Sequence, residues 1–152
     1  MPVRGFTLIE VMVVMVIIGV MAGMAVGLMR PDPGRAAEAE AWRLARLTER
    51  LGREAEMTGQ VLALSWTADG YEFTRRDDDG NWAPLDSDNV FEPRRFEAGM
   101  RLADSGEVRF APDGEIEPRR WLLITEVAEV AINLSALGEA TVERQAVPGG
   151  DS

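Results

Sequence analysis

The chain has 152 residues, of which 46% are hydrophobic and 28% charged, so it has room for one modest domain and an appendage. Its 16 basic residues, all of them Arg, stand against 26 acidic residues and give a net charge of −10, which disfavours a protein that wraps nucleic acid. Cys and His are both absent. This absence excludes disulfides, thiolate or imidazole metal sites, Cys nucleophiles and Ser-His-Asp triads.

The first predicted element is an apolar helix over residues 6–29, in which Glu10 is the only charged residue. A helix of that length reaches about 36 Å, enough to cross a hydrocarbon core of roughly 30 Å. Only Arg4 carries a charge ahead of it, so the tip is expected on the cytoplasmic side and the acidic bulk of the chain on the far side. A carboxylate at this depth is costly and needs a partner, which makes Glu10 a candidate functional residue.

The alternative to a retained membrane helix is a cleaved secretory signal peptide, for which the small residues Ala25 and Gly27 offer a cleavage site. The apolar run exceeds the usual signal-peptide core of about 7–15 residues, and Glu10 interrupts its start, so both features oppose that alternative.

The glycines at every fourth position of this helix (Gly19, Gly23 and Gly27) have two interpretations. They either let another helix approach closely or reflect the general tolerance of glycine in membrane helices.

Residues 4–10 read RGFTLIE and lead directly into the apolar run. This motif resembles the type III signal of type IV pilins and type II secretion pseudopilins. In that family the prepilin peptidase cuts after the glycine and the new N-terminal residue is methylated. The resemblance implies that residues 1–5 are a leader, that cleavage falls between Gly5 and Phe6, and that Phe6 becomes N-methylated.

The same resemblance implies that Glu10 pairs with the N-terminus of a neighbouring subunit during assembly. A free α-amine has a pKa of about 7.7–8.0, so the amine of a processed Phe6 carries a positive charge at neutral pH. Two opposite charges in a dry layer neutralise each other, which favours the addition of subunits in register.

A break is predicted at residues 30–34, where two prolines and a glycine interrupt the helix. A second, stalk helix is predicted over residues 35–58. Its apolar positions step by four and three along one face: Ala37, Ala41, Leu44, Thr48, Leu51 and Ala55. This narrow stripe needs a sheet to cover it.

After Gly59 the apolar period changes to two, so residues 59–147 are predicted to be a β-rich domain and residues 148–152 a flexible tail. Short strands are expected around residues 62–66, 71–73, 100–102, 108–110, 121–125, 127–134 and 139–144, separated by turn clusters. The predicted fold class is therefore α+β, with a long N-terminal helix, half transmembrane and half stalk, packed on an antiparallel sheet. The resemblance makes this a type IV pilin-like fold.

Three features of this domain have a simple structural interpretation. The acidic turn at residues 77–80 does not fit a calcium loop, because Arg75 would occupy its first position and no Glu its twelfth. The arginine pairs at 75/76, 94/95 and 119/120 have acidic sequence neighbours (Asp77, Glu92, Glu97 and Glu117), which predicts local neutralisation. The four tryptophans are expected in the core, with Trp82 as the candidate for a protein interface.

Within the pilin-like family, three segments resemble minor pseudopilin H of type II secretion, a group that includes the FimT-type minor pilins. They are residues 44–64 (LARLTERLGREAEMTGQVLAL), 70–73 (GYEF) and 81–85 (NWAPL). The resemblance implies a non-enzymatic subunit near the tip of a periplasmic pseudopilus that drives export across the outer membrane. The alternative is a minor type IV pilin for pilus assembly or DNA uptake. Residues 31–152 carry 25 acidic and 14 basic side chains, a net charge of −11, which disfavours the DNA-uptake alternative.

The implied partners are the prepilin peptidase, the major pseudopilin G, the minor pseudopilins I, J and K, and the inner membrane. No catalytic residue, cofactor, metal or nucleic acid is expected. The resemblance places the chain in the inner membrane as a single-pass protein, with its C-terminal domain in the periplasm and, after processing, in the pseudopilus.

Overall fold

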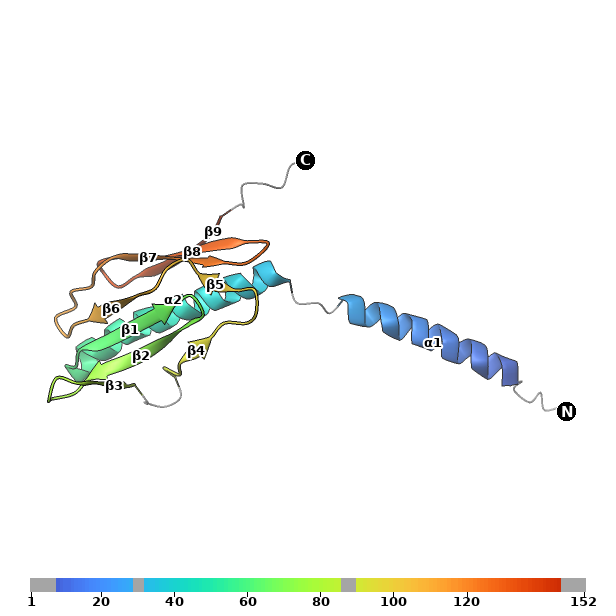
Figure 1. Ribbon diagram of the computed structural model, residues 1–152, viewed down its shortest axis with the longest axis horizontal. Helices are drawn as coiled ribbons and strands as arrows, with labels where there is room; N and C mark the ends of the chain where they lie inside the picture. The colour runs from blue at the N-terminus through green and yellow to red at the C-terminus, as the bar shows by residue number, and fades with distance from the viewer. Residues whose placement is uncertain (1–7, 29–31, 86–89, 146–152) are drawn as a thin grey trace. The chain divides into compact units, whose positions relative to one another are not determined.

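A computed structural model describes residues 8–28, 32–85 and 90–145. The chain divides into two compact units, Met1–Asp32 and Pro33–Ser152. The first unit contains helix α1 (Leu8–Leu28; Figure 1). The side chains of its residues 8–23 are all exposed.

Helix α2 (Pro33–Thr58) opens the second unit, two residues earlier than the sequence predicts. Pro33 suits a first helical position, because its fixed φ is preorganised and no backbone N–H is needed there. The helix ends at Gly59, which has a φ of 68° and donates its N–H to the Ala55 carbonyl at 3.0 Å. Every position of the predicted apolar stripe is buried: Ala37, Ala41, Leu44, Thr48, Leu51 and Ala55.

The strands form two antiparallel sheets. The first has five strands: β1 (Leu62–Thr67), β2 (Gly70–Arg76), β3 (Trp82–Pro84), β4 (Arg94–Arg95) and β6 (Gly106–Phe110). Its order is β3-β2-β1-β6, with β4 pairing to β2 beside β3. The second sheet has the order β5-β7-β8-β9: β5 (Arg101–Leu102), β7 (Arg119–Ile124), β8 (Glu129–Leu134) and β9 (Ala140–Gln145).

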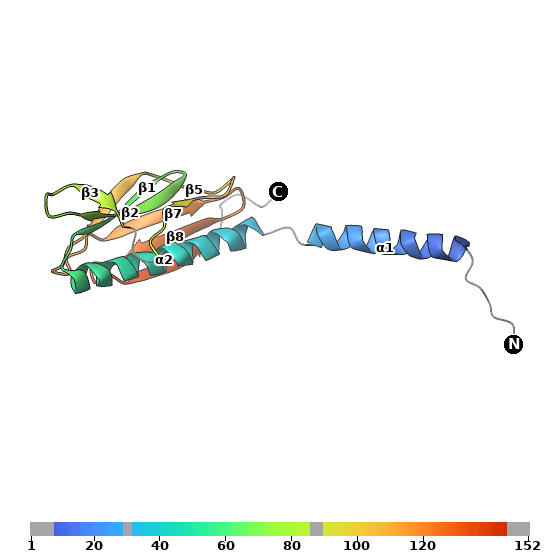
Figure 2. The same ribbon diagram turned by 90° about the horizontal axis from the view of Figure 1, so that it is seen from below.

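Both sheets lie on the same side of α2 (Figure 2) and bury their alternating apolar residues against it. In β1, for example, Leu62, Leu64 and Trp66 are buried. The α+β prediction is confirmed, but the sequence predicts one antiparallel layer where the structure has two sheets. The chain passes from β4 to β5, back to β6 and on to β7, so it changes sheet three times in succession. Local alternation carries no information about such long-range pairing.

Candidate functional site

The predicted processing positions, Gly5 and Phe6, lie outside the described residues. Glu10 lies in the first turn of α1, and its side chain is exposed. A carboxylate there interacts favourably with the partial positive charge of the helix N-terminus. None of the described residues forms an ion pair with Glu10, so its charge is available to another molecule.

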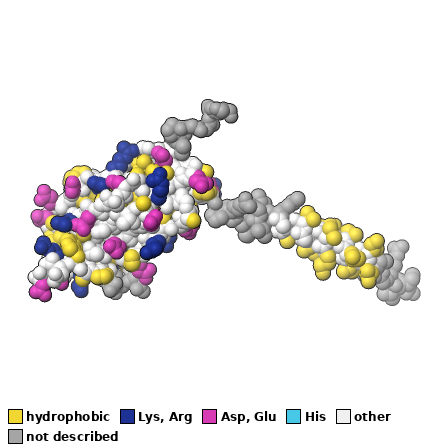
Figure 3. Space-filling view, in the orientation of Figure 1, with side chains coloured by type: hydrophobic (Ala, Val, Ile, Leu, Met, Phe, Trp, Pro, Cys, Tyr) yellow, Lys and Arg dark blue, Asp and Glu magenta, His cyan; other side chains and the backbone are white. Residues whose placement is uncertain are grey.

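On the face of α1 seen in Figure 3 the described side chains are mostly hydrophobic, and residues 11–23 include no charged or polar side chain. Its large side chains are exposed by 44% (Val14) to 80% (Leu8). A Cβ added at Gly19 or Gly23 would meet no atom within 4 Å, so that face is open as well. Because burial of apolar surface stabilises by about 25 cal/mol per Å², a helix of this kind requires another apolar surface to cover it. Within the described part of the chain, no helix combines the length and hydropathy needed to span a membrane.

The second unit holds a partly buried polar cluster that joins α2 to the first sheet. Glu40 on α2 is only 8% exposed. Its Oε1 accepts a hydrogen bond from the Tyr71 hydroxyl at 2.9 Å and another from Arg94 Nε at 3.3 Å. Its Oε2 accepts from Arg94 Nη2 at 3.1 Å, which makes the Glu40–Arg94 contact bidentate. The cluster therefore ties β2 and β4 to the helix.

The protonation states in this cluster follow from burial and charge. Burial raises the pKa of Tyr71 well above its usual range, and the neighbouring Glu40 carboxylate raises it further. The hydrogen bond from Arg94 to Glu40 raises the pKa of the guanidinium. Tyr71 is therefore a neutral donor, Arg94 a cationic donor and Glu40 their shared acceptor.

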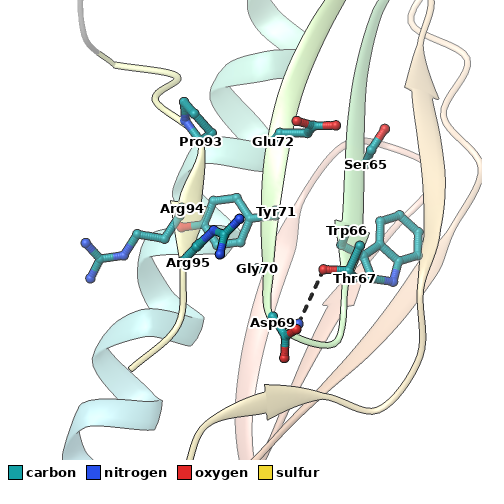
Figure 4. A pocket seen from close by; sticks show the side chains of 10 residues that line it. All are labelled: Ser65, Trp66, Thr67, Asp69, Gly70, Tyr71, Glu72, Pro93, Arg94 and Arg95. Atoms are coloured by element: carbon teal, nitrogen blue, oxygen red, sulfur yellow. Dashed lines mark hydrogen bonds between the residues drawn. The ribbon is translucent and has the colours of Figure 1, made fainter. Parts of the chain in front are cut away.

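A groove of about 620 Å³ runs beside this cluster, between the β1–β2 hairpin and β4 (Figure 4). Its polar lining includes Ser65, Thr67, Asp69, Glu72 and Arg95. The Arg94 side chain extends from the groove toward α2, where it is held by Glu40. The lining contains no His or Cys, and its Ser65 hydroxyl donates a hydrogen bond to Glu107 Oε2 at 3.4 Å.

A second polar cluster joins the two sheets. Asp104 accepts hydrogen bonds from Trp66 Nε1 on β1 at 3.1 Å and from Arg119 Nη2 on β7 at 2.7 Å. The Arg119 guanidinium lies 4.8 Å from the centre of the Trp66 ring, and Trp66 contacts Trp121 edge to face at 5.5 Å. These contacts join β1 of the first sheet to β7 of the second.

In two of the three arginine pairs, 94/95 and 119/120, one arginine forms an ion pair with a carboxylate, as predicted. The carboxylates are not the predicted sequence neighbours. Arg94 pairs with Glu40, 54 positions away, and not with Glu92 or Glu97. Arg119 pairs with Asp104 and not with Glu117. Residues that are adjacent in the sequence do not supply these partners, because strand pairing and helix packing bring distant residues together.

The pairing of Glu40 with Tyr71 and Arg94 was not predicted from the sequence. A usable signal existed, because Glu40 lies between Ala37, Ala41 and Leu44 on the buried face of α2. A carboxylate on such a face must be paired.

In the acidic turn at residues 77–80, Asp77 Oδ1 accepts a hydrogen bond from the Asn81 N–H at 2.7 Å, so this carboxylate stabilises the turn itself. No three acidic side chains of the described residues are placed so that they could hold a metal ion.

Trp66 and Trp121 lie in the core as expected, whereas the expectation is wrong for Trp42, which is 41% exposed. Trp82 is 37% exposed, and the Arg109 guanidinium lies 5.5 Å from its ring.

Comparison with known proteins gives three consistent results. Residues 1–26 match the family model of the prokaryotic N-terminal methylation motif. The chain is 37% identical to type II secretion system protein H of Pseudomonas aeruginosa over 119 residues, which cover 77% of this chain and 69% of the relative. It is 31% identical to type II secretion system protein H of Klebsiella pneumoniae over an alignment of 170 positions, gaps included, which covers 93% of this chain and 96% of the relative.

The fold resembles two solved structures of the minor pseudopilin EpsH from the type II secretion system of Vibrio cholerae. The TM-scores are 0.61 and 0.63, at 18% and 14% sequence identity. The matches cover 75% and 79% of this chain and 98% and 100% of the solved chains. The second unit therefore has the pseudopilin fold, as the sequence resemblance predicts.

Proposed function

Because the chain belongs to the family of type II secretion system protein H, we propose that it is a non-enzymatic minor pseudopilin near the tip of a periplasmic pseudopilus. In this role it helps to drive protein export across the outer membrane. One observation carries the proposal: a single chain combines the methylation motif, an apolar helix with one carboxylate, and an α+β unit with the EpsH fold.

The prepilin peptidase cleaves the chain between Gly5 and Phe6, and Phe6 is then methylated. Support comes from the methylation-motif match over residues 1–26, which includes both positions. Cleavage leaves a charged α-amine four residues ahead of Glu10.

Glu10 binds the N-terminal amine of a neighbouring pseudopilin during assembly. Its exposed position in the first turn of α1 supports this role, as does the lack of an ion-pair partner among the described residues. In an apolar layer the interaction of two opposite charges is strong, and an unpaired carboxylate there is costly.

Residues 6–29 anchor the chain in the inner membrane before assembly and pack against other pseudopilins, of the G, I, J and K types, after it. The apolar, exposed surface of α1 supports both environments, because each would cover it. With Arg4 on the cytoplasmic side, the second unit faces the periplasm. The net charge of −11 over residues 31–152 gives the alternative role in DNA uptake less support.

Intact-mass spectrometry of the membrane-extracted full chain tests the processing step. We expect the loss of residues 1–5 and the addition of one methyl group at Phe6. A chain cleaved after Gly27, or one left uncleaved in cells that contain the peptidase, would contradict the proposal.

The Glu10→Ala variant tests assembly separately from processing. We expect normal cleavage and methylation but much reduced recovery of the chain in the isolated secretion complex, since the charge partner of the incoming amine is gone. Glu56→Ala, which removes an exposed carboxylate of α2, is the matched control and should assemble normally. Normal incorporation of the Glu10 variant would refute this role of the carboxylate.

A further inference from the structure

Most of the edge strands of the two sheets are closed to further pairing. β3 has three residues and ends on Pro84, which has no backbone N–H to donate. β4 and β5 have two residues each. The side of β6 that faces away from β1 is bridged by Ile116, which pairs with Phe110. Among the described strands, β9 with its six residues is therefore the long edge strand that stays open.

One contact shows which amides of β9 point outward. In an antiparallel ladder the N–H groups of an edge strand point alternately toward the partner strand and away from it. The Ala140 N–H points away from β8, because it donates to Glu49 Oε1 of α2 at 3.0 Å. The backbone groups of Val142 and Arg144, two and four residues further on, therefore also point outward. No described strand pairs with them across this edge.

An exposed tryptophan of α2 borders these two residues. Trp42 lies two helical turns before Glu49, which places it on nearly the same side of α2 and about 10 Å nearer the start of the helix. β9 runs from Ala140 in that same direction (Figure 1), and a strand rises about 3.3 Å per residue. Trp42 is therefore level with Val142 and Arg144, and it is 41% exposed.

We propose that β9 accepts an extended segment of a different polypeptide as an added antiparallel strand. The segment exchanges hydrogen bonds with the backbone groups of Val142 and Arg144. In strand addition of this kind the main-chain hydrogen bonds supply affinity, and the contacts of alternate side chains supply specificity. The antiparallel direction is the more stable of the two.

The side chains at this edge define the chemistry of the segment. Val142 and Arg144 share one face of β9, and Val142 packs against the core on that face. A residue opposite Val142 would lie beside the Trp42 ring, so an apolar side chain fits there. Arg144 is exposed, so an acidic side chain fits opposite it. The best segment therefore carries a carboxylate and, two residues later, an apolar side chain.

A second copy of this chain fits the edge less well. Two identical β9 strands that pair antiparallel are related by a two-fold axis across the strands, which makes their α2 helices run in opposite directions. In copies anchored in one membrane by α1, as proposed above, both α2 helices begin at the membrane side. The exclusion of a second copy thus rests on the proposed function, whereas the open edge does not.

Hydrogen exchange followed by mass spectrometry tests the added strand directly. In the full chain alone in detergent, the amides of Val142 and Arg144 should exchange rapidly, whereas the alternate amides of β9, which bond to β8, should be protected. In membranes that contain the assembled secretion complex, the fragment 140–145 should retain two more protected amides. An unchanged fragment would overturn the inference.

Photocrosslinking identifies the partner. Benzoylphenylalanine in place of Trp42 should form an adduct with another polypeptide of the complex, identified by mass spectrometry. Val142→Pro removes one outward N–H and no hydrogen bond to β8, so it should lower the adduct yield about tenfold while the domain stays folded. Val142→Thr keeps the N–H and the branched shape, and as the matched control it should leave the yield unchanged. Equal yields from the two variants, or an adduct between two copies of this chain, would overturn the inference.

A charge reversal covers the case in which Val142→Pro does not fold. Arg144→Glu keeps every backbone group, and repulsion by the facing carboxylate should lower the adduct yield about threefold. Arg120→Glu, at an exposed position on β7, changes the net charge equally and should have little effect. Equal effects of the two reversals would contradict the proposed strand.

The same experiments separate this inference from the proposed function. If the chain is absent from the secretion complex but still forms the Trp42 adduct with another polypeptide, the proposed function fails and the acceptor strand remains. If the chain is present in the complex and forms no such adduct, only the acceptor strand is wrong.

Discussion

At the scale of single residues, the second unit relies on a few polar groups that are paired over long sequence distances. Glu40 receives hydrogen bonds from Tyr71 and Arg94, which lie 31 and 54 positions further along the chain. Glu40 is nearly buried, whereas the Arg94 side chain is 39% exposed. Water therefore screens the ion pair in part, and the hydrogen bonds contribute more to stability than the Coulomb attraction alone.

The first prediction concerns the ionisation of Tyr71, the only tyrosine in the chain. Its raised pKa means that folding favours the protonated phenol, so the stability gained is present below about pH 10 and is lost as the pH rises above it. Absorbance at 295 nm should show no phenolate near pH 10 while the domain stays folded. A midpoint near 10 in the folded protein would contradict the buried position of the hydroxyl.

The second prediction concerns Glu40. Glu40→Ala removes the acceptor shared by Tyr71 and Arg94 and should lower the free energy of unfolding by about 1–3 kcal/mol. Denaturant unfolding of the full chain in detergent, followed by tryptophan fluorescence, measures this change. Glu72→Ala, which alters an exposed carboxylate on β2, is the control and should change stability by less than about 0.5 kcal/mol.

At the scale of the elements, the pairing of β4 with β2 depends on a missing side chain. A Cβ at Gly70 would lie 2.0 Å from the carbonyl oxygen of Arg94, far inside van der Waals contact. Only glycine therefore lets the two strands approach at the register that pairs Gly70 with Arg95. This contact brings Arg94 within reach of Glu40, so a local backbone requirement controls a distant ion pair.

The third prediction follows from that close approach. Gly70→Ala should force β4 away from β2, weaken the Arg94–Glu40 contact and lower the free energy of unfolding by about 1–3 kcal/mol or more. Gly52→Ala in α2 is the matched control. Its added Cβ would meet Phe110 Cδ1 at 3.5 Å, an ordinary contact, and alanine favours the helix by up to about 1 kcal/mol. Equal effects of the two substitutions, again measured by denaturant unfolding, would refute this account.

At the scale of the whole molecule, the sequence predicts two units of different kind, and the reasons are physical. The α1 segment has a wholly apolar run, α2 has a period of 3.6 and the strands have a period of two, so each pattern indicates its element locally. The pattern does not specify that β5 joins β7 while β6 joins β1, nor that Glu40 meets Arg94. Such contacts depend on how distant segments pair. Asp104 and Gly70 contribute to this pairing only within the folded sheets, so a local sequence pattern does not reveal their role.

The N-terminal motif differs from these long-range contacts because the local sequence is enough to recognise it. The proposed roles of Gly5, Phe6 and Glu10 rest on a sequence motif within the matched residues 1–26, and not on contacts within this chain.

The edge strand β9 is partly closed by a side chain of the same protein. The N–H of Ala140, at the start of that strand, donates to Glu49 Oε1 of α2 at 3.0 Å. A foreign strand that approached this border would find its first amide already engaged by the protein's own carboxylate. A strand of another molecule could therefore pair with β9 only beyond its first residue, so this side chain shortens the edge that is open to extension of the sheet.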